Sequence, residues 1–220
     1  MTPSDRESKP DRQEIETSKE ARARREAANG VRQTDFVFET IDRILADEKP
    51  FKLRPSLLGE LNRLAVEGLT RFAGVPRPHG MTITGSGHTP PPANKVQAHI
   101  EELCDYVNDN WNKSPVHLAA YVMWRLNWIH PYDDGNGRTS RAAAYIVLSA
   151  RLKTRLPGTS TIVDQIVSSK KAYYAALEDA DRHETEGQLD VGEMENLISS
   201  LLAKQFATIH ASANSELPQG

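Results

Sequence analysis

Residues 114–148 read SPVHLAAYVMWRLNWIHPYDDGNGRTSRAAAYIVL, and this stretch decides the fold. Eleven of the fourteen residues from 116 to 129 are apolar or aromatic, and a second apolar run covers residues 142–148. A helix that is apolar on nearly all sides is buried at the centre of a domain. The Ser-Pro pair before the first run is a typical helix start, and the proline after His130 ends that helix. We therefore expect two central helices joined by a loop over residues 130–141.

Outside this stretch, apolar residues recur at helical spacing and predict amphipathic helices. These segments cover residues 34–49, 55–72, 96–107, 163–180 and 192–210. One segment differs: residues 81–84 read MTIT, follow a run rich in glycine and proline, and are β-prone. We interpret them as one strand of a short β-hairpin flap. The sequence thus predicts an all-α fold over residues 34–210 with one flap.

Both ends of the chain have a different composition. Residues 1–33 hold 15 charged residues of both signs, and residues 1–13 contain two prolines, which predicts partial disorder there. Helix formers from 14 to 28 predict an exposed helix that ends at the following Asn-Gly pair. The small and polar residues 211–220 predict a disordered tail.

Overall composition excludes several classes of protein. The 220 residues include 27 Lys and Arg against 30 Asp and Glu, a net charge of −3, which argues against nucleic acid as a partner. The single cysteine, Cys104, excludes an intrachain disulfide and a cysteine-based zinc cluster. No apolar run approaches the ~18 residues that a membrane span needs, and no secretory signal pattern opens the chain. We expect a cytoplasmic protein with no membrane partner.

The loop between the central helices has the composition of an anion site. Gly135, Asn136 and Gly137 precede the second helix, and such glycines let backbone N–H groups form a nest at a positive helix end. Arg138 and Arg141 are three residues apart and share a helix face. Guanidinium groups match phosphate oxygens in geometry. A polyanion such as a polyphosphate fits this pattern, although a plain turn neutralised by neighbouring acids also fits it.

Two further side chains complete a reactive set. Asp134 lies beside the nest, and a carboxylate next to phosphates is typical of a site where Mg²⁺ bridges the two. His130 has an unperturbed pKa near ~6.5, which suits a general base at neutral pH. A lone histidine is more often structural, but its position beside the nest favours catalysis. The other six histidines show no metal-ligand spacing and are interpreted as structural or exposed.

Residues 130–141 resemble the Fic-domain family. The family motif is H-x-F-x-[DE]-G-N-[GK]-R-x-x-R, and the chain matches every fixed position except Tyr132, where the family has Phe. The MTIT segment with the following GSGH and three prolines is similar to the family's flap, and the resemblance covers about residues 34–205. It implies a Fic-type helical domain that transfers AMP from ATP to a Ser, Thr or Tyr hydroxyl of a protein target, the chain itself included, releasing pyrophosphate.

The resemblance also implies a role for each site residue. His130 would take the proton of the target hydroxyl, and Asp134 would hold Mg²⁺ against the phosphates of ATP. The anion hole would be formed by Gly135, Asn136 and Gly137, with Arg138 on the β-phosphate and Arg141 on the γ-phosphate. Thr82, Ile83 and Thr84 would register the target by strand addition. Tyr173 and Tyr174 resemble the pair that lines the adenine pocket, although either one can instead be a packing residue.

The donor, the activity and the regulation stay open at this point. Doc-type kinases of the family carry Lys in place of Gly137, so the glycine favours AMP transfer over phosphorylation. Transfer of UMP or phosphocholine, removal of AMP and a non-catalytic nucleotide-sensing module are the alternatives. Many Fic proteins carry an inhibitory [ST]-x-x-x-E-[GN] helix, which no segment matches fully. Glu26 is the candidate autoinhibitory residue, and a separate inhibitory protein is a further alternative. Glu67 is interpreted as a decoy within a core helix, and Glu195 has Val191 where the motif has Ser or Thr.

Overall fold

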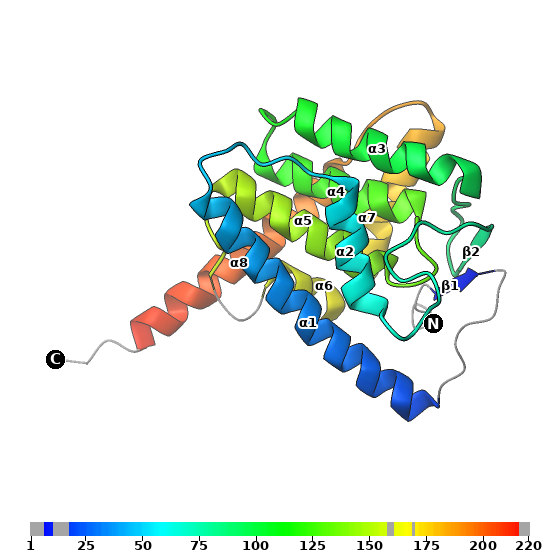
Figure 1. The fold of residues 1–220 in the computed structure, drawn as a ribbon. Helices are drawn as coiled ribbons and strands as arrows, with labels where there is room; N and C mark the ends of the chain where they lie inside the picture. The colour runs from blue at the N-terminus through cyan, green and yellow to red at the C-terminus, as the bar shows by residue number, and fades with distance from the viewer. Residues whose placement is uncertain (1–6, 11–17, 158–160, 169, 216–220) are drawn as a thin grey trace.

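The computed structural model describes residues 7–10, 18–157, 161–168 and 170–215, with side chains described for residues 18–208 outside the gaps. Within these ranges the chain forms eight α-helices and one two-stranded antiparallel ribbon (Figure 1). The all-α prediction with a flap strand is confirmed. In chain order the elements are β1 (Glu7–Pro10), α1 (Lys19–Ala46), α2 (Pro55–Val66), β2 (Met81–Thr84), α3 (Ala93–Asp109), α4 (Pro115–Ile129), α5 (Asn136–Leu152), α6 (Ile162–Ser168), α7 (Lys170–Thr185) and α8 (Gly192–Ser215).

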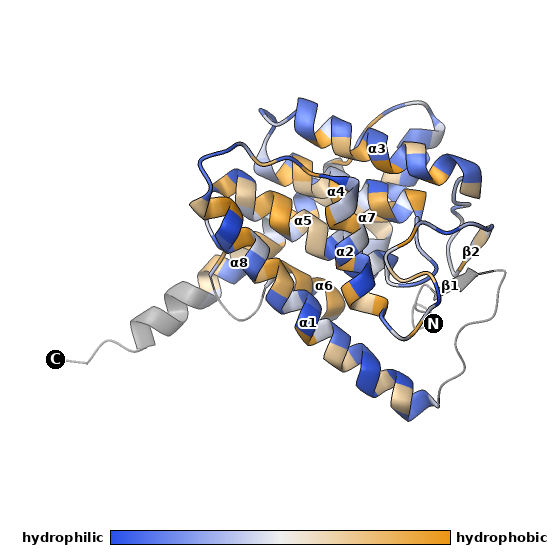
Figure 2. Ribbon diagram, viewed as in Figure 1, coloured by the Kyte–Doolittle hydropathy of each residue, from blue (hydrophilic) through white to orange (hydrophobic). Residues whose placement is uncertain are grey.

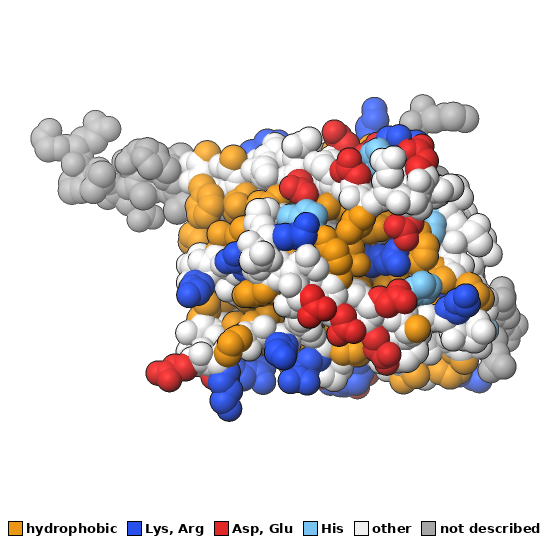
Figure 3. All heavy atoms as spheres, turned by 90° about the horizontal axis from the view of Figure 1, so that it is seen from above, with side chains coloured by type: hydrophobic (Ala, Val, Ile, Leu, Met, Phe, Trp, Pro, Cys, Tyr) orange, Lys and Arg blue, Asp and Glu red, His pale blue; other side chains and the backbone are white. Residues whose placement is uncertain are grey.

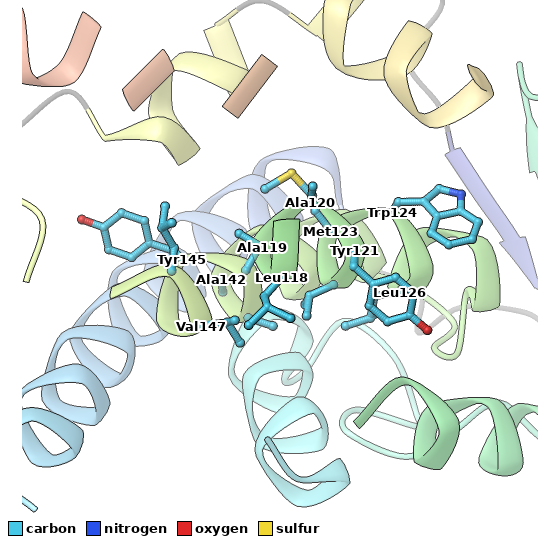
Figure 4. Packing of buried hydrophobic residues seen from close by; sticks show 14 of the residues in the cluster. Leu118, Ala119, Ala120, Tyr121, Met123, Trp124, Leu126, Ala142, Tyr145 and Val147 are labelled. Carbon is cyan, nitrogen blue, oxygen red and sulfur yellow. The ribbon is translucent and has the colours of Figure 1, made fainter. Parts of the chain in front are cut away.

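The helices α4 and α5 form the centre of the domain, as their sequence predicts. The helix α4 is mostly hydrophobic in Figure 2, as is α5 after its polar first turns, and α1, α2, α3, α7 and α8 pack around this pair. Figure 4 shows side chains of both helices interdigitating in the core, among them Leu118, Leu126 and Val147, each fully or almost fully buried. The predicted cap is present, since Ser114 Oγ accepts a hydrogen bond of 3.0 Å from the His117 N–H. The loop that joins α4 and α5 is therefore held between two rigid elements.

The helix α1 corrects one prediction. It runs unbroken for 28 residues through Asn29 and Gly30, where the sequence predicts an end. The reason is tertiary: Asn29 is buried, and its side-chain amide donates to the carbonyls of Ala65 and Glu67 at the end of α2. Gln33, one turn further on, donates to the Leu61 carbonyl. These bonds between α1 and α2 compensate a glycine that costs about 1 kcal/mol in a helix.

Other boundaries also differ from the sequence expectation. The helix α2 ends at Val66 rather than near residue 72. Residues 162–168 and 170–185 are helical, as α6 and α7, on either side of residue 169, which lies outside the described residues, so the expected helix over 163–180 extends further at its end. The helix α8 continues to Ser215, beyond the predicted start of the tail at 211, while residues 216–220 lie outside the described part. Helix ends depend on tertiary capping more than on periodicity, so these are the least predictable positions.

The flap is present, but it is not a hairpin. Strand β2 pairs with β1 from the start of the chain, with Glu7 opposite Thr84 and Pro10 opposite Met81 (Figure 1). Residues 7–10 lie in the segment for which the sequence predicts disorder, and they form a strand. The remainder of that predicted segment, residues 1–6 and 11–13, lies outside the described residues.

Among the described helices, none combines the length and the apolar character that crossing a bilayer requires. The face seen from above carries acidic, basic and histidine side chains close to one another (Figure 3). This face therefore has no field of a single sign.

Candidate active site

The loop between α4 and α5 adopts two left-handed conformations that fix its path. His130 is the C-cap residue directly after α4, with φ 49° and ψ 58°, and its N–H donates to the Leu126 carbonyl at 3.1 Å. Gly135 precedes α5 with φ 78°, and a Cβ there would lie 2.6 Å from a methyl carbon of Val66. Only glycine fits this position, because both the dihedral angle and the close approach of α2 exclude a side chain.

The side chain of Asn136 braces the same loop. Its Oδ1 accepts from the Tyr132 N–H at 2.9 Å, and its Nδ2 donates to the Tyr132 carbonyl at 2.7 Å. The Tyr132 ring is buried, as expected for an anchor in the core, and burial raises the pKa of its hydroxyl. The Asn136 side chain thus shapes the loop. Its backbone N–H, at the start of α5, is the group that can bind an anion.

A buried arginine that the sequence reasoning missed joins the loop to the flap. Arg77 is 2% exposed, and its guanidinium donates to the carbonyls of His130 at 2.8 Å, His79 at 2.8 Å and Pro91 at 2.5 Å. Asp133 faces this charge: burial raises the pKa of its carboxyl, and the nearby His79 and Arg77 oppose that rise. Nothing in the local pattern distinguishes Arg77 from an exposed arginine, so only the three-dimensional structure reveals it.

The imidazole of His130 is oriented by α4. Its Nδ1 lies 3.2 Å from the Asn127 carbonyl, and with a proton on Nδ1 the nitrogen that can accept a proton is Nε2. The Asn127 side chain links three helices, since its Nδ2 lies 2.7–2.8 Å from Met123 O, Ser140 Oγ and Tyr173 Oη. Asn127 is one of only three residues that are not apolar in residues 116–129. A polar residue in this apolar run was the sequence feature from which its role could have been predicted.

The two arginines of the loop lie in different environments. Arg138 donates to the Ala65 carbonyl at 3.0 Å, and its Nη2 lies 3.3 Å from Oδ2 of Asp134. The Nε of Arg141 is buried and has no hydrogen-bond partner within the part of the chain that the structure describes. The Arg141 guanidinium crosses directly over Gly137, where a Cβ would meet its Nη1 at 3.1 Å. Of the two arginines, Arg141 is therefore the one with a buried N–H donor left to bind a ligand.

The carboxylate of Asp134 is surrounded by donors. Its Oδ1 accepts the Gly135 N–H at 2.5 Å, and its Oδ2 lies 2.9 Å from Nη2 of Arg22 in the helix α1. Arg22 also contacts Glu26 one turn later, at 3.2 Å. The described residues contain no cluster of three or more histidine, cysteine or acidic groups placed to hold a metal. One carboxylate does suit Mg²⁺ that takes its other ligands from phosphates and water.

Many of these residues line one cavity of about 490 Å³, within the ~300–1,000 Å³ typical of small-molecule sites. Its wall combines the loop, the start of α5, the flap, α1 and α7. The lining residues are Arg22, Glu26, Ile83, His88, Asn127, Trp128, His130, Asp134, Gly135, Asn136, Gly137, Arg138, Arg141, Lys170, Tyr173, Tyr174, Leu177 and Asp181.

The structure therefore brings most of the predicted site residues to this one cavity. Of the flap residues, Ile83 is buried and faces the cavity, whereas Thr82 and Thr84 are exposed. Tyr173 is almost fully buried, and its hydroxyl is hydrogen-bonded to Asn127, so it packs in the core as well as lining the cavity. Tyr174 is half-buried. His88 lines the cavity although the sequence reading treats it as structural or exposed, and its Nε2 lies 2.7 Å from the Trp128 carbonyl.

The candidate inhibitory residue Glu26 and the two rejected glutamates, Glu67 and Glu195, lie in different places. Glu26 lines the cavity together with Arg141, but the ion pair that the structure gives it is with Arg22. Glu67 pairs with Arg32 and Arg63, and Glu195 pairs with His117 at 2.7 Å. Neither Glu67 nor Glu195 is among the residues that line the cavity.

The segment that contains the reactive loop also matches a known protein family. The profile of the Fic/DOC family matches residues 52–148, which include α4, the loop and most of α5. The protein adenylyltransferase Fic of Drosophila willistoni is 40% identical over 57 residues, 25% of this chain and 11% of that protein. The adenylyltransferase fic-1 of Caenorhabditis elegans is 28% identical over 91 residues, 40% of this chain and 16% of that protein. Each match thus spans a small part of the relative.

Solved structures resemble the chain over most of its length. Fic-1 (residues 134–508) of C. elegans superposes with a TM-score of 0.69 and 19% identity, covering 92% of this chain and 56% of that one. A Fic domain containing signaling protein from Bacteroides thetaiotaomicron gives a TM-score of 0.66 and 23% identity, covering 87% and 74%. At these identities the likeness concerns the fold. The family match covers the site itself, and over residues 52–148 the chain therefore carries a Fic domain of the Fic/DOC family.

Proposed function

We propose that the protein transfers AMP from ATP to a hydroxyl side chain of a protein target and releases pyrophosphate. The observation that carries the proposal is the single cavity in which His130, the glycine loop and two arginines converge. The curated relatives that match this segment are named protein adenylyltransferases. Because the matched stretches cover a small share of those relatives, their activity is a hypothesis for this chain.

The loop supplies an electrostatic seat for a triphosphate. The first turn of α5 presents backbone N–H groups and the positive end of the helix dipole, and Arg138 and Arg141 add two charges on one face. With the outer phosphates held by the arginines, the α-phosphate lies toward His130. Arg141 is the stronger candidate for the γ-phosphate, because its buried Nε lacks a partner in the described residues.

His130 would act as the general base. Its Nε2 would accept the proton of the target hydroxyl as that oxygen attacks the α-phosphorus, and the bond from this phosphorus to the bridging oxygen would break. Positioning and charge stabilisation carry most of the acceleration in phosphoryl and nucleotidyl transfer. The bonds that hold His130 at both its carbonyl and its Nδ1 serve that positioning.

Asp134 would hold Mg²⁺ together with the phosphates of ATP, and the ion would supply charge neutralisation to the leaving pyrophosphate. The donor set fits, since the Asp134 carboxylate lines the cavity beside the glycine loop and a triphosphate brings the remaining oxygen ligands. The Arg22 guanidinium lies against that carboxylate, so binding of the metal nucleotide requires this ion pair to open or to be shared.

The experiment that tests the proposal separates the transferred group. The purified chain with Mg²⁺ is incubated with ATP labelled at the α- or the γ-phosphate, or with labelled UTP, in the presence of a cell lysate. Label in protein from α-labelled ATP alone supports AMP transfer. Label from the γ-position or from UTP would replace it with phosphorylation or UMP transfer. The matched control is His130→Asn, because asparagine tolerates the left-handed backbone of this position while removing the base.

Regulation by Glu26 is part of the proposal. Glu26 lines the cavity and holds Arg22, which in turn holds Asp134. We expect Glu26→Ala to change the rate of self-modification in the α-labelled assay. An unchanged rate would leave regulation to a separate inhibitory protein.

A further inference from the structure

The flap strand already carries a peptide strand, and that strand belongs to the same chain. Strand β1, Glu7–Pro10, runs antiparallel along β2, Met81–Thr84, in a continuous four-residue register. Figure 1 shows the two strands side by side at the edge of the domain, away from the helical core. The pairing joins segments more than seventy residues apart, so it is not a turn-driven hairpin.

An exposed strand edge is the element on which a peptide docks by main-chain hydrogen bonds. Under the proposed function, on which this inference rests, the flap edge is where a target segment is held. Residues 7–10 occupy that edge, so they stand where a target would stand.

The register singles out one residue of the segment. Ser8 is directly opposite Ile83, the flap residue that is buried and lines the cavity together with His130. Directly opposed residues of an antiparallel pair lie on the same face of the ribbon. Glu7 and Lys9 are opposite the exposed Thr84 and Thr82, on the other face. Ser8 is also the one hydroxyl residue among the four, which read ESKP.

We propose that Ser8 is an acceptor of AMP in an intramolecular reaction. The Ser8 oxygen forms a bond to the α-phosphorus of ATP, and the bond from that phosphorus to the α,β-bridging oxygen breaks. The hydroxyl proton passes to His130, and pyrophosphate leaves. The acceptor segment and the catalytic residues belong to one chain, and the pairing of β1 with β2 holds them together, so the transfer needs no encounter between molecules. The segment also competes with protein targets for the same edge.

The test incubates the full chain with Mg²⁺ and ATP and maps the modified peptide by mass spectrometry. We expect AMP on Ser8, loss of that modification in Ser8→Ala, and its return in Ser8→Thr. The register control is the double variant Ser8→Ala, Lys9→Ser, which moves the hydroxyl by one position to the other face of the ribbon. We expect this variant to be unmodified at residue 9. The first-order rate constant should not change over a tenfold dilution of the protein.

Three outcomes of the self-modification assay would overturn the inference, and a fourth comes from the lysate. One is AMP on residues 1–17 in Ser8→Ala at the wild-type level, and a second is full modification of the register control. The third is equal labelling of wild-type chain and a size-tagged His130→Asn chain mixed with it, which would mean transfer between molecules. If lysate proteins received AMP while Ser8 stayed unmodified, this inference would be rejected and the proposed function would be retained. If neither Ser8 nor any lysate protein were modified, the proposed function would fail as well.

Discussion

The ion pair between Arg22 and Asp134 predicts that removal of one arginine strengthens the binding of a metal nucleotide. Nη2 of Arg22 lies 2.9 Å from Oδ2 of Asp134, and the two side chains are 27% and 22% exposed. A hydrogen bond to a charged group is worth about 1.5–3 kcal/mol when buried, and partial exposure reduces this to about 1–2 kcal/mol. Since 1–2 kcal/mol corresponds to a factor of about 5–30, Arg22→Ala should lower the dissociation constant of Mg²⁺-ATP by that factor.

Isothermal titration on a His130→Asn background measures this affinity without turnover. The matched control is Arg24→Ala, which removes an equal charge from an exposed position of the same helix and should leave the affinity within about twofold. A second titration in EDTA separates the metal from the nucleotide. There Arg22→Ala should bind ATP no better than the parent, because the competition is for the carboxylate that holds the metal. Weaker binding of Mg²⁺-ATP by Arg22→Ala, with Arg24→Ala unchanged, would refute the reasoning and make Arg22 a nucleotide ligand.

Three further predictions concern the loop and the core. Arg141→Ala should weaken the binding of ATP by about tenfold or more, consistent with loss of a charge-assisted bond, and leave AMP binding unchanged in titration calorimetry; an equal loss for both nucleotides would reject the γ-phosphate assignment. Gly135→Ala should destabilise the fold in urea unfolding by about 2–5 kcal/mol, because left-handed strain adds to overpacking against Val66. The control Gly187→Ala has the same positive φ in open space and should lose only about 1–2 kcal/mol; equal losses would mean that crowding at Gly135 is unimportant. Burial raises the pKa of Cys104 to about 12, above the unfolded value near ~8.5, so the unfolded state loses its proton first as pH rises. The wild type should therefore lose stability relative to Cys104→Ala above pH ~8.5, by at most about 1.4 kcal/mol per pH unit, and parallel profiles in denaturant titrations from pH 7 to 10 would contradict this.

The sequence predicts the central helices and the reactive loop because these depend on local pattern. The apolar runs of α4 and α5 need no partner to be recognised, and the loop residues from His130 to Arg141 carry their roles within twelve positions. The break predicted at Asn29 was wrong because its amide is used by the carbonyls of α2, which lie 36 and 38 residues away in sequence. Local propensity cannot anticipate a hydrogen bond of that range.

The same limit explains what the site prediction missed. Arg22 and Asp134 are 112 residues apart, and the partner of β2 comes from the start of the chain. His88 and Lys170 reach the cavity only through the packing of the flap and α7. Composition marked residues 1–33 as a charged appendage, from which only Glu26 was predicted to reach the site, whereas the structure places Arg22 in the wall of the cavity as well.

Arg77 gives the flap and the base a common reference point. One planar guanidinium binds both the carbonyl of His130 and that of Pro91, where the chain leaves the flap. A displacement of the flap that stretched one of these bonds would strain the other. Arg77 therefore fixes the position of a peptide bound on β2 relative to the imidazole of His130. Lysine carries the same charge on a single nitrogen and cannot span these carbonyls at once. Arg77→Lys should therefore leave the flap and the catalytic loop folded but disturb the position of one relative to the other.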